Sequence, residues 1–390
     1  ILTMDNTTTN NTTNVPLAKR QKIKNAHDIN IVPDPAAMKI LEHENISKGF
    51  VTDFHKNGCA IVRNFASASE CDGMRKEMAQ LIENWDPKSV TTFRTDEKQE
   101  LAQGSSDYFL DSANRIHFFC EPGVVDENTG EIIQGMTKDE GLNKVGHGLH
   151  VANPIFMKYA QSAKVAALAR ALGWKNPVLP QSMYIFKQPK IGGEVTSHQD
   201  STFLFTEPRQ TCLGLWLALE DATEENGCVW GRPGSHKEPV RRHFKRNKEW
   251  FEMNKRDVPQ MIFENLVDNI EKSNCPWEGG MPGKMKDDSD SDGSGSNKET
   301  NEKSTMDKYK LQEKQKEDVR QAGFIPLSCK KGDLVLIHGS VDHLSLANIS
   351  SKSRHTFQLH LIDGPKEGIK WSEGNWLQYP KGIIFPALDL

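Results

Sequence analysis

The sequence predicts an α+β fold with a β-sandwich or barrel at its centre. Helix caps and helical periodicity dominate the first part of the chain, whereas apolar or alternating runs between turn residues dominate after Gly173. No internal repeat is present in the sequence. Polar stretches precede and interrupt the ordered-looking sequence. We therefore expect a disordered tail at 1–44 and one domain at 45–390, with a disordered insertion at about 284–314.

The first two predicted helices lie between residues 50 and 85. Apolar residues at 50–54 indicate a short helix that stops at Gly58, and residues 60–62 indicate a strand. Ser67 and Glu70 predict a capping box at the start of the second helix, because each side chain can bond the other residue's backbone amide. Apolar residues follow it at helical spacing: Cys71, Met74, Met78, Leu81, Ile82 and Trp85.

A third helix is predicted from Pro154, directly after the capping residue Asn153, to Gly173. Strands are predicted from apolar or alternating runs bounded by turn residues, at 183–186, 213–219, 228–230, 334–337 and 357–362. Asn226 and Gly227 predict a hairpin turn between two of these strands, because this residue pair accepts the positive φ angles of a tight turn.

Composition excludes several classes of protein. Hydrophobic residues make up 36% of the 390 residues, and no apolar run is long enough for a membrane span or a secretory signal. The net charge of −4 argues against a dedicated nucleic-acid binder. The 7 cysteines contain no Cys-x-x-Cys pair, which argues against a disulfide framework and a structural zinc site. We expect a cytoplasmic protein. The basic cluster at 19–24 leaves the nucleus as an alternative, and residues 387–390 do not form a peroxisomal signal.

Two histidines and one aspartate could form a metal site. His198 and Asp200 are two residues apart, so in an extended segment both side chains point to one face. His343 follows a strand-like run and could supply a third ligand. Such a set leaves three metal positions open for a cosubstrate and O₂, as in non-haem Fe(II) oxygenases. The pattern is weak by itself, because His-x-Asp often occurs by chance.

Neighbouring residues favour the metal hypothesis. Gly192 and Gly193 precede the His-x-Asp pair, and Arg354 follows His343 where its planar guanidinium could clamp a carboxylate. The alternative is an ordinary loop histidine at 343 and a surface ion pair at Arg354.

The motifs resemble the phytanoyl-CoA dioxygenase family of Fe(II)/2-oxoglutarate oxygenases over about residues 48–378. Segments that carry the resemblance are 104–110, 181–189, 192–200, 220–222, 226–228 and 334–343. The segment 371–378, which contains Trp371, Asn375 and Trp376, is typical of one subgroup of this family.

The resemblance implies a double-stranded β-helix, or jelly roll, with flanking helices. It implies that Fe(II) is held by His198, Asp200 and His343. It also implies that 2-oxoglutarate contacts Lys144, Met183, Trp216, Ser345 and Arg354. Such an enzyme decarboxylates 2-oxoglutarate to succinate and CO₂, consumes O₂ and hydroxylates a small molecule. The substrate is not identified by the resemblance, and a fatty acyl derivative is one candidate.

Physical chemistry agrees with most of the implied 2-oxoglutarate contacts. Arg354 and Ser345 could bind the distal carboxylate by charge-assisted hydrogen bonds, and Lys144 adds a cation. Met183 and Trp216 could supply apolar walls. Lys144 could instead be a solvated amine, and the other two could be ordinary core residues.

Two other functions remain as alternatives. The chain could be a catalytically silent metal- or ligand-binding domain used in protein interactions, although its His198, Asp200 and Arg354 are all intact. It could also be a cupin-like metalloenzyme that does not use 2-oxoglutarate. The pairing of Arg354 with Ser345 argues against that class.

Three other histidines, a basic segment and a departure from the family pattern lie outside the implied site residues. His338 is a rival ligand to His343, but it ends a strand at a non-ligand position of the family pattern. His147 and His150 could line the site near Lys144, but a structural role is favoured. The basic segment 241–248 could attract an anionic substrate or nucleic acid, but a solvated face is favoured. The sequence departs from the family at 231–232, where Gly and Arg replace apolar residues and put the local packing in doubt.

Overall fold

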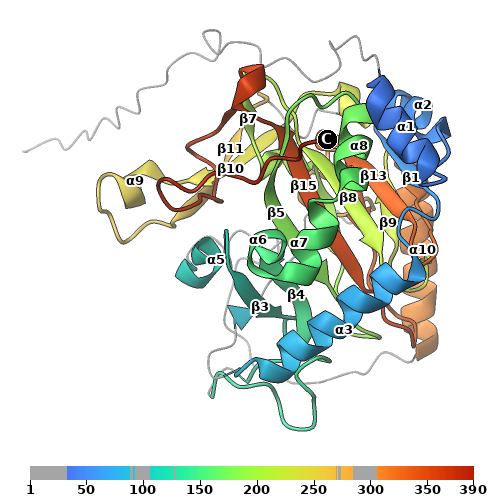
Figure 1. Ribbon diagram of the computed structural model, residues 1–390. Helices are drawn as coiled ribbons and strands as arrows, with labels where there is room; N and C mark the ends of the chain where they lie inside the picture. The colour runs from blue at the N-terminus through green and yellow to red at the C-terminus, as the bar shows by residue number, and fades with distance from the viewer. Residues whose placement is uncertain are drawn as a thin grey trace, which may run out of the picture.

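The computed structural model describes residues 33–87, 91–92, 106–126, 129–268, 270, 274–283 and 305–390. Two β-sheets form the centre of the molecule, with helices packed on one face of the larger sheet (Figure 1). This arrangement confirms the predicted α+β class with a sandwich-like core.

The larger sheet has eight strands, in the order β1 (Cys59–Val62), β13 (Leu334–His338), β8 (Leu213–Ala218), β15 (Thr356–Asp363), β5 (Pro177–Ile185), β4 (Leu142–His147), β3 (Ile116–Cys120) and β2 (Thr91–Thr92). The smaller sheet has four strands, in the order β12 (Ile325–Pro326), β9 (Val229–Gly231), β14 (His343–Ser345) and β6 (Val195–His198). Two strand pairs lie outside these sheets: β10 (Arg242–Arg246) with β11 (Met261–Asn265), and β16 (Lys370–Trp371) with β7 (Thr206–Glu207).

Strand β8 shows why the central strands are apolar on both faces. Leu215 and Leu217 pack into the core cluster that includes the helices. The alternate residues Trp216 and Ala218 pack into a second cluster, together with residues of the smaller sheet. Because successive side chains point to opposite faces, a strand covered on both sides needs a continuous apolar run.

The helices are α1 (Pro35–His43), α2 (Gly49–Asn57), α3 (Ala68–Asn84), α5 (Asp107–Asp111), α6 (Leu149–Ala152), α7 (Pro154–Ala160), α8 (Ala163–Ala171), α9 (Lys248–Phe251) and α10 (Thr305–Gln321). The capping box predicted at Ser67 and Glu70 is present at the start of α3. Helix α2 ends as predicted at Gly58, whose φ of 76° is a left-handed conformation that suits glycine.

The predicted helix from Pro154 to Gly173 is wrong in its continuity, because two helices occupy this segment. Helix α7 ends at Ala160, and Ser162 then caps α8 by accepting a hydrogen bond from the Val165 amide. Serine competes for local backbone groups in this way, so it favours a new helix start over an uninterrupted helix.

The predicted hairpin at Asn226 and Gly227 is also wrong. The strands on either side, β8 and β9, belong to different sheets, so this turn carries the chain from the larger sheet to the smaller. Gly227 has the expected positive φ of 81°, but the Asn226 side chain accepts from the Thr223 amide at 2.7 Å. This local bond closes a turn without pairing the flanking strands.

The boundaries of both predicted disordered segments need correction. Helix α1 lies within the predicted tail 1–44, and its Ala37 and Leu41 are fully buried in the core that includes α8. Helix α10 starts at Thr305, inside the predicted insertion at 284–314, and its Val319 packs into the second core cluster. Residues 1–32, with the basic cluster, and residues 284–304 lie outside the described residues.

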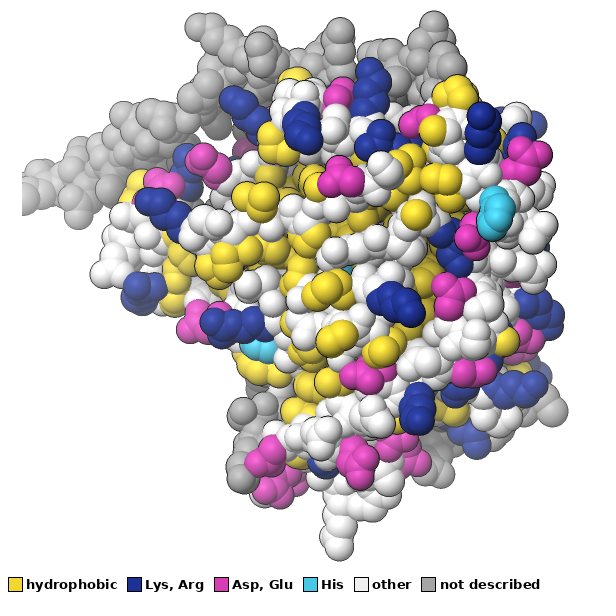
Figure 2. Space-filling model, viewed as in Figure 1, with side chains coloured by type: hydrophobic (Ala, Val, Ile, Leu, Met, Phe, Trp, Pro, Cys, Tyr) yellow, Lys and Arg dark blue, Asp and Glu magenta, His cyan; other side chains and the backbone are white. Residues whose placement is uncertain are grey.

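The cysteines, the helices and the surface charges of the described residues can be compared with the expectations from composition. All seven cysteines are buried and free, as expected for a chain without a disulfide framework. Within the described ranges, no helix combines the length and apolar character needed to cross a membrane. On the face drawn in Figure 2, basic and acidic side chains are interspersed.

Candidate active site

Three side chains with metal-binding atoms meet where β6 and β14 pair. His198 ends β6, Asp200 begins the following 3₁₀ turn, and His343 begins β14 directly opposite His198. The Asp200 Oδ1 atom lies 3.6 Å from His198 Nε2 and 3.5 Å from His343 Nε2. One ligand atom from each residue lies within 4.8 Å of the others, so a single ion could contact all three.

The two histidines are held in the form that a metal requires. His198 Nδ1 donates to the Thr196 carbonyl at 2.8 Å, and His343 Nδ1 donates to the Val341 carbonyl at 3.1 Å. Because a carbonyl only accepts, each neutral ring keeps its proton on Nδ1 and its lone pair on Nε2, facing Asp200. The donor set therefore fits a divalent metal such as iron.

The pKa values of His343, Asp200 and His198 are shifted by burial and by one another. Burial and the neighbouring His198 lower the pKa of His343 to about 4, so its ring is neutral at physiological pH. Burial alone would raise the pKa of Asp200, but His343 and His360 hold it well below its ordinary value. Burial opposes a charge on His198 too, yet the hydrogen bond with Asp200 raises the pKa of this ring.

His360, on β15, contacts the other oxygen of the Asp200 carboxylate. Its Nε2 lies 3.4 Å from Asp200 Oδ2, while Oδ1 faces the other two histidines. The carboxylate thus presents one oxygen to the metal position and the other to His360. His360 was not among the residues predicted for the site.

Arg354 is a buried cation, only 3% exposed. Its guanidinium lies over the Trp216 ring at 4.9 Å, and Nη1 donates to the Gly227 carbonyl. Among the described residues, Nε has no hydrogen-bond partner. Burial lowers the pKa of Arg354 to about 10, which still leaves it charged. A buried guanidinium with unused donors is suited to an anionic ligand.

Lys187 places a second cation beside Ser345. It is 3% exposed, and its Nζ donates to Ser345 Oγ at 2.9 Å and to the Gly193 carbonyl. Burial and the nearby Arg354 cation lower the pKa of Lys187 to about 7. Met183, Ile185 and Lys187 line the same cavity, but β5 ends at Ile185 and Lys187 has a positive φ, so strand alternation alone does not place this residue.

All eight predicted site residues line one cavity of about 170 Å³ between the two sheets: Lys144, Met183, His198, Asp200, Trp216, His343, Ser345 and Arg354. Glu121, Lys187 and His360 line the same cavity and were not predicted. Burial raises the pKa of Glu121, while Lys187 opposes that rise.

Lys144 lies in an apolar part of the cavity wall. Its Nζ is 3.8 Å from Met183 Sδ and stands over the rings of Phe109 and Phe119, 5.8 Å and 5.4 Å from their centroids. Burial lowers the pKa of Lys144 well below its ordinary value. Because Lys144 is only 5% exposed, the alternative of a solvated amine is wrong.

Aromatic side chains line another part of the cavity. Phe203 lies beside the His198 ring, with 5.9 Å between centroids, and also contacts Phe244. Phe109 stacks on Trp376 at 4.2 Å. Segment 371–378 thus contributes directly to this wall, which is suited to an apolar group of a substrate.

The remaining histidines stay outside the metal cluster. His338 does not line the cavity, and its Nδ1 accepts from the Ser340 amide. His150 bonds Ser182 and the Leu179 carbonyl within the core. His147 contacts Ser112 at 2.6 Å. These contacts agree with the structural roles predicted for His147 and His150.

The departure at 231–232 is part of a buried ion network. Gly231 lies against Cys59, where an added Cβ would come within 3.2 Å of the cysteine sulfur. Arg232 forms ion pairs with Asp342 and Glu238. The added charge is therefore paired and largely covered, and the close packing at Gly231 explains the small residue.

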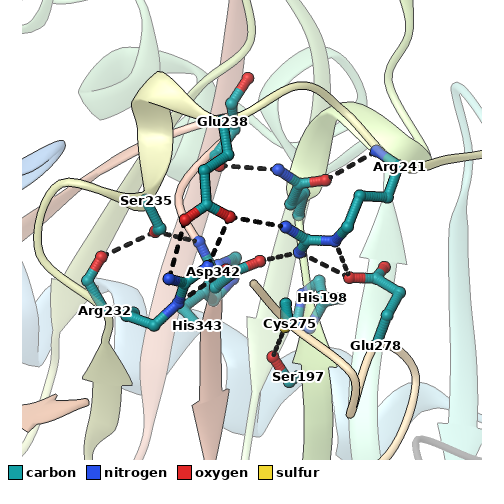
Figure 3. A network of polar contacts seen from close by, with 12 residues as sticks. Ser197, His198, Arg232, Ser235, Glu238, Arg241, Cys275, Glu278, Asp342 and His343 are labelled. Carbon is teal, nitrogen blue, oxygen red and sulfur yellow. Dashed lines mark hydrogen bonds and ion pairs between the residues drawn. The ribbon is translucent and has the colours of Figure 1, made fainter. Parts of the chain in front are cut away.

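Asp342 is the centre of this network, behind the residue that begins β14 (Figure 3). Arg232 and Arg241 approach the Asp342 carboxylate from two sides, and Arg241 also bonds Glu278 at 2.7 Å. Cys275, Glu278 and Asp342 are close enough to hold an ion, but Arg241 already donates to both carboxylates. The network is thus a buried support for the segment that carries His343.

The prediction of a solvated basic face at 241–248 is wrong at Arg241 and His243. Arg241 is 1% exposed and belongs to the ion network, and His243 is buried against Phe205, with Nε2 3.0 Å from Asn375 Oδ1. Sequence alone could not separate these residues from their exposed neighbours, because their partners lie far away in the chain.

A family model and two relatives of this chain all carry the name phytanoyl-CoA dioxygenase. The family model for phytanoyl-CoA dioxygenase (PhyH) matches residues 54–356. Phytanoyl-CoA dioxygenase domain-containing protein 1 of Danio rerio is 38% identical over 354 residues, which are 90% of this chain and 99% of the relative. Phytanoyl-CoA dioxygenase of Arabidopsis thaliana is 35% identical over 328 residues, which are 84% and 92% of the two chains.

Solved structures resemble the chain in fold. The epimerase SnoN, in complex with Fe³⁺, alpha ketoglutarate and nogalamycin RO, has a TM-score of 0.50 at 14% identity, covering 91% of this chain and 100% of its own. The non-heme alpha ketoglutarate dependent carbocyclase SnoK has a TM-score of 0.50 at 15% identity, covering 89% and 98%. This likeness confirms the predicted jelly-roll fold.

Proposed function

This chain belongs to the phytanoyl-CoA dioxygenase family, and from that premise we propose that it decarboxylates 2-oxoglutarate to succinate and CO₂ and hydroxylates a small-molecule substrate. As a member of this family it is a 2-oxoglutarate-dependent dioxygenase, with Fe(II) and 2-oxoglutarate as cofactor and cosubstrate and O₂ as the oxidant.

His198, Asp200 and His343 are the residues we assign to Fe(II). The support is the shared position of their ligand atoms, the Nδ1–H tautomer of both histidines, and the low pKa of Asp200. When bound, the iron supplies the activation of O₂ that oxidation of a C–H bond requires. The carbonyl partners of Nδ1 leave Nε2 of both rings for the metal, and the neighbouring rings hold the carboxylate ionised.

Arg354 and Ser345 are assigned to the distal carboxylate of 2-oxoglutarate. Arg354 offers a buried, charged guanidinium with unused donors, and Ser345 lies two residues after His343 on β14. Trp216 lies against the guanidinium and, with Met183, forms apolar walls that exclude water from the bound cosubstrate. We assign Lys144 to a further contact of the same molecule.

One observation carries the proposal. The three candidate iron ligands and the buried Arg354 line a single cavity, and no described carboxylate lies at ion-pair distance from Arg354. A metal position and an anion position in one cavity suit a cosubstrate that is both a chelator and a carboxylate.

The aromatic residues of the cavity wall support a proposal for the class of substrate. Phe109, Phe203, Phe244 and Trp376 line part of the cavity, and Phe203 lies beside the His198 ring. Such a wall favours an apolar group at the site of hydroxylation. A fatty acyl derivative meets this requirement and is our first candidate substrate class.

Adding Fe(II) and 2-oxoglutarate to the protein without oxygen tests the cosubstrate site directly. We expect a visible iron-to-ketoacid charge-transfer band, absent in Asp200→Ala and weakened in Arg354→Ala. Arg320→Ala is the matched control, because Arg320 pairs with Glu224 on the surface. After O₂ is admitted, succinate should form. A folded protein that gives neither the band nor succinate would contradict the proposal and favour the silent binding domain.

A further inference from the structure

We infer that Lys187 is a second cation for the distal carboxylate of 2-oxoglutarate, acting together with Arg354 and Ser345. This inference rests on the proposed function, because 2-oxoglutarate is the anion concerned. It adds a binding residue from the segment just after β5 to Ser345, which ends β14, and Arg354, which precedes β15.

The ammonium group of Lys187 is placed for a third partner. A lysine ammonium carries three donors. Ser345 Oγ, at 2.9 Å, and the Gly193 carbonyl account for two of them. Among the described residues, no further acceptor takes the third. Because Ser345 is itself assigned to the cosubstrate, a carboxylate bonded to its hydroxyl would lie next to this ammonium.

The backbone around Lys187 is held in an uncommon conformation. Its φ is +44°, which a residue with a side chain adopts only at some cost. Asn348 stabilises this conformation by donating from Nδ2 to the Lys187 carbonyl at 2.8 Å. A strained residue held in place by a buried amide is typical of a functional position.

Gly227 contacts both Lys187 and Arg354. A Cβ at this position would lie 2.7 Å from Lys187 Cε, so only glycine leaves room for the lysine side chain. The Gly227 carbonyl accepts from Arg354 Nη1. The turn at 226–227 therefore brings the two positive groups to one end of the cavity.

Two like charges in one buried cavity destabilise each other unless an anion lies between them. Among the described residues, no carboxylate lies at ion-pair distance from Lys187 or Arg354. Glu121 lines the same cavity but interacts with both cations only at longer range. A ligand carboxylate is the group that completes this arrangement.

Calorimetric titration of the Fe(II)-loaded protein without oxygen tests the inference. The two ligands are 2-oxoglutarate and 2-oxopentanoate, which has the same carbon chain without the distal carboxylate. In Lys187→Met we expect the affinity for 2-oxoglutarate to fall by about tenfold to a hundredfold, with little change for 2-oxopentanoate. Lys187→Arg should retain most of the affinity, because it keeps the charge.

Lys164→Met is the matched control, since Lys164 is buried but pairs with Glu70 outside the cavity. It should bind both ligands like the wild type. If Lys187→Met weakens both ligands equally, or weakens neither, the inference is wrong while the proposed function stands. If the wild type does not bind 2-oxoglutarate at all, the proposed function fails and the inference fails with it.

Discussion

At the scale of single residues, His360 is the strongest candidate for orienting a metal ligand. Its contact with Asp200 Oδ2 leaves Oδ1 facing both histidines. Outer-shell groups of this kind typically contribute 10- to 100-fold to metal affinity. We expect His360→Phe to weaken Fe(II) binding by about tenfold or more, and His360→Gln, which keeps a donor, to weaken it less.

Metal titration with Mn(II), followed by electron paramagnetic resonance, measures this effect without turnover. His338→Gln is the control, because His338 is a buried histidine outside the cavity. Equal affinities in the wild type and His360→Phe would show that Asp200 does not need this contact.

Lys187 also predicts how the binding of 2-oxoglutarate depends on pH. Burial and Arg354 lower the pKa of this lysine to about 7, whereas Glu121, Glu194 and Cys228 act in the opposite direction. A bound carboxylate would raise the pKa again, so binding above pH 7 takes up a proton. Affinity should therefore fall as pH rises above about 7, by at most tenfold per pH unit.

Calorimetry in two buffers with different ionisation enthalpies counts the protons taken up. The wild type should take up close to one proton per 2-oxoglutarate at pH 8 and clearly less at pH 6. Lys187→Met should lack this difference. Proton uptake that persists in the variant would assign it to another group in the cavity.

The candidate site was largely predictable at the residue scale, and its gaps have physical reasons. His198, Asp200, His343 and Arg354 stand in short motifs whose chemistry is local and recognisable. His360 has no such motif, because its role depends on β15 lying beside β8 in the sheet. Lys187 continues the spacing of Met183 and Ile185 beyond the strand, but its role depends on Ser345 and Arg354, which are far away in the chain.

At the scale of elements, the ion network behind β14 should contribute far more to stability than surface ion pairs do. The side chain of Arg232 is 14% exposed, and its partner Asp342 is fully buried. Removing one partner of a buried pair typically costs about 3–5 kcal/mol, because the other charge stays buried. We expect Arg232→Met to lower the free energy of unfolding by roughly 2–4 kcal/mol, since Arg241 still pairs with Asp342.

Urea unfolding followed by tryptophan fluorescence measures this loss, with Arg320→Met as the matched control. Arg320 is 48% exposed in its pair with Glu224, so its removal should cost at most about 1 kcal/mol. If the two variants lose the same stability, the network does not support the segment that carries His343.

Element prediction succeeded where the signal was local and failed where the outcome depended on distant contacts. The capping box of α3 and the glycine stop of α2 act within one turn of the chain. The strands β8 and β9 were recognised, but their separation into two sheets was not. Pairing of β8 with β13 and β15, rather than with its neighbour in sequence, is decided by burial on both faces.

At the scale of the whole molecule, the two-sheet architecture brings together the ligands that the sequence separates. Residues 198 and 343 are neighbours only because β6 and β14 pair in the smaller sheet. The limits of the two predicted polar segments were wrong for a related reason. Helix α10 is polar over most of its length, and Val319 anchors it in the core. An average over a segment does not detect so narrow an apolar face. Helix α1 is short and apolar, with Leu41 in the core, but it directly follows a long polar stretch of sequence.

Because the proposed site lies between the two sheets, filling it should stabilise the entire fold. A ligand present at 100 times its Kd adds about 2.7 kcal/mol to the free energy of unfolding. For a domain of this size we expect Tm to rise by a few degrees with Mn(II) and again with 2-oxoglutarate.

Asp200→Ala should lose both increments of Tm, because the metal ligand is absent. Arg354→Ala should keep the first and lose most of the second. Differential scanning fluorimetry, with a chelator to return each protein to its starting Tm, separates the two steps. Equal increments in all three proteins would place the ligands elsewhere.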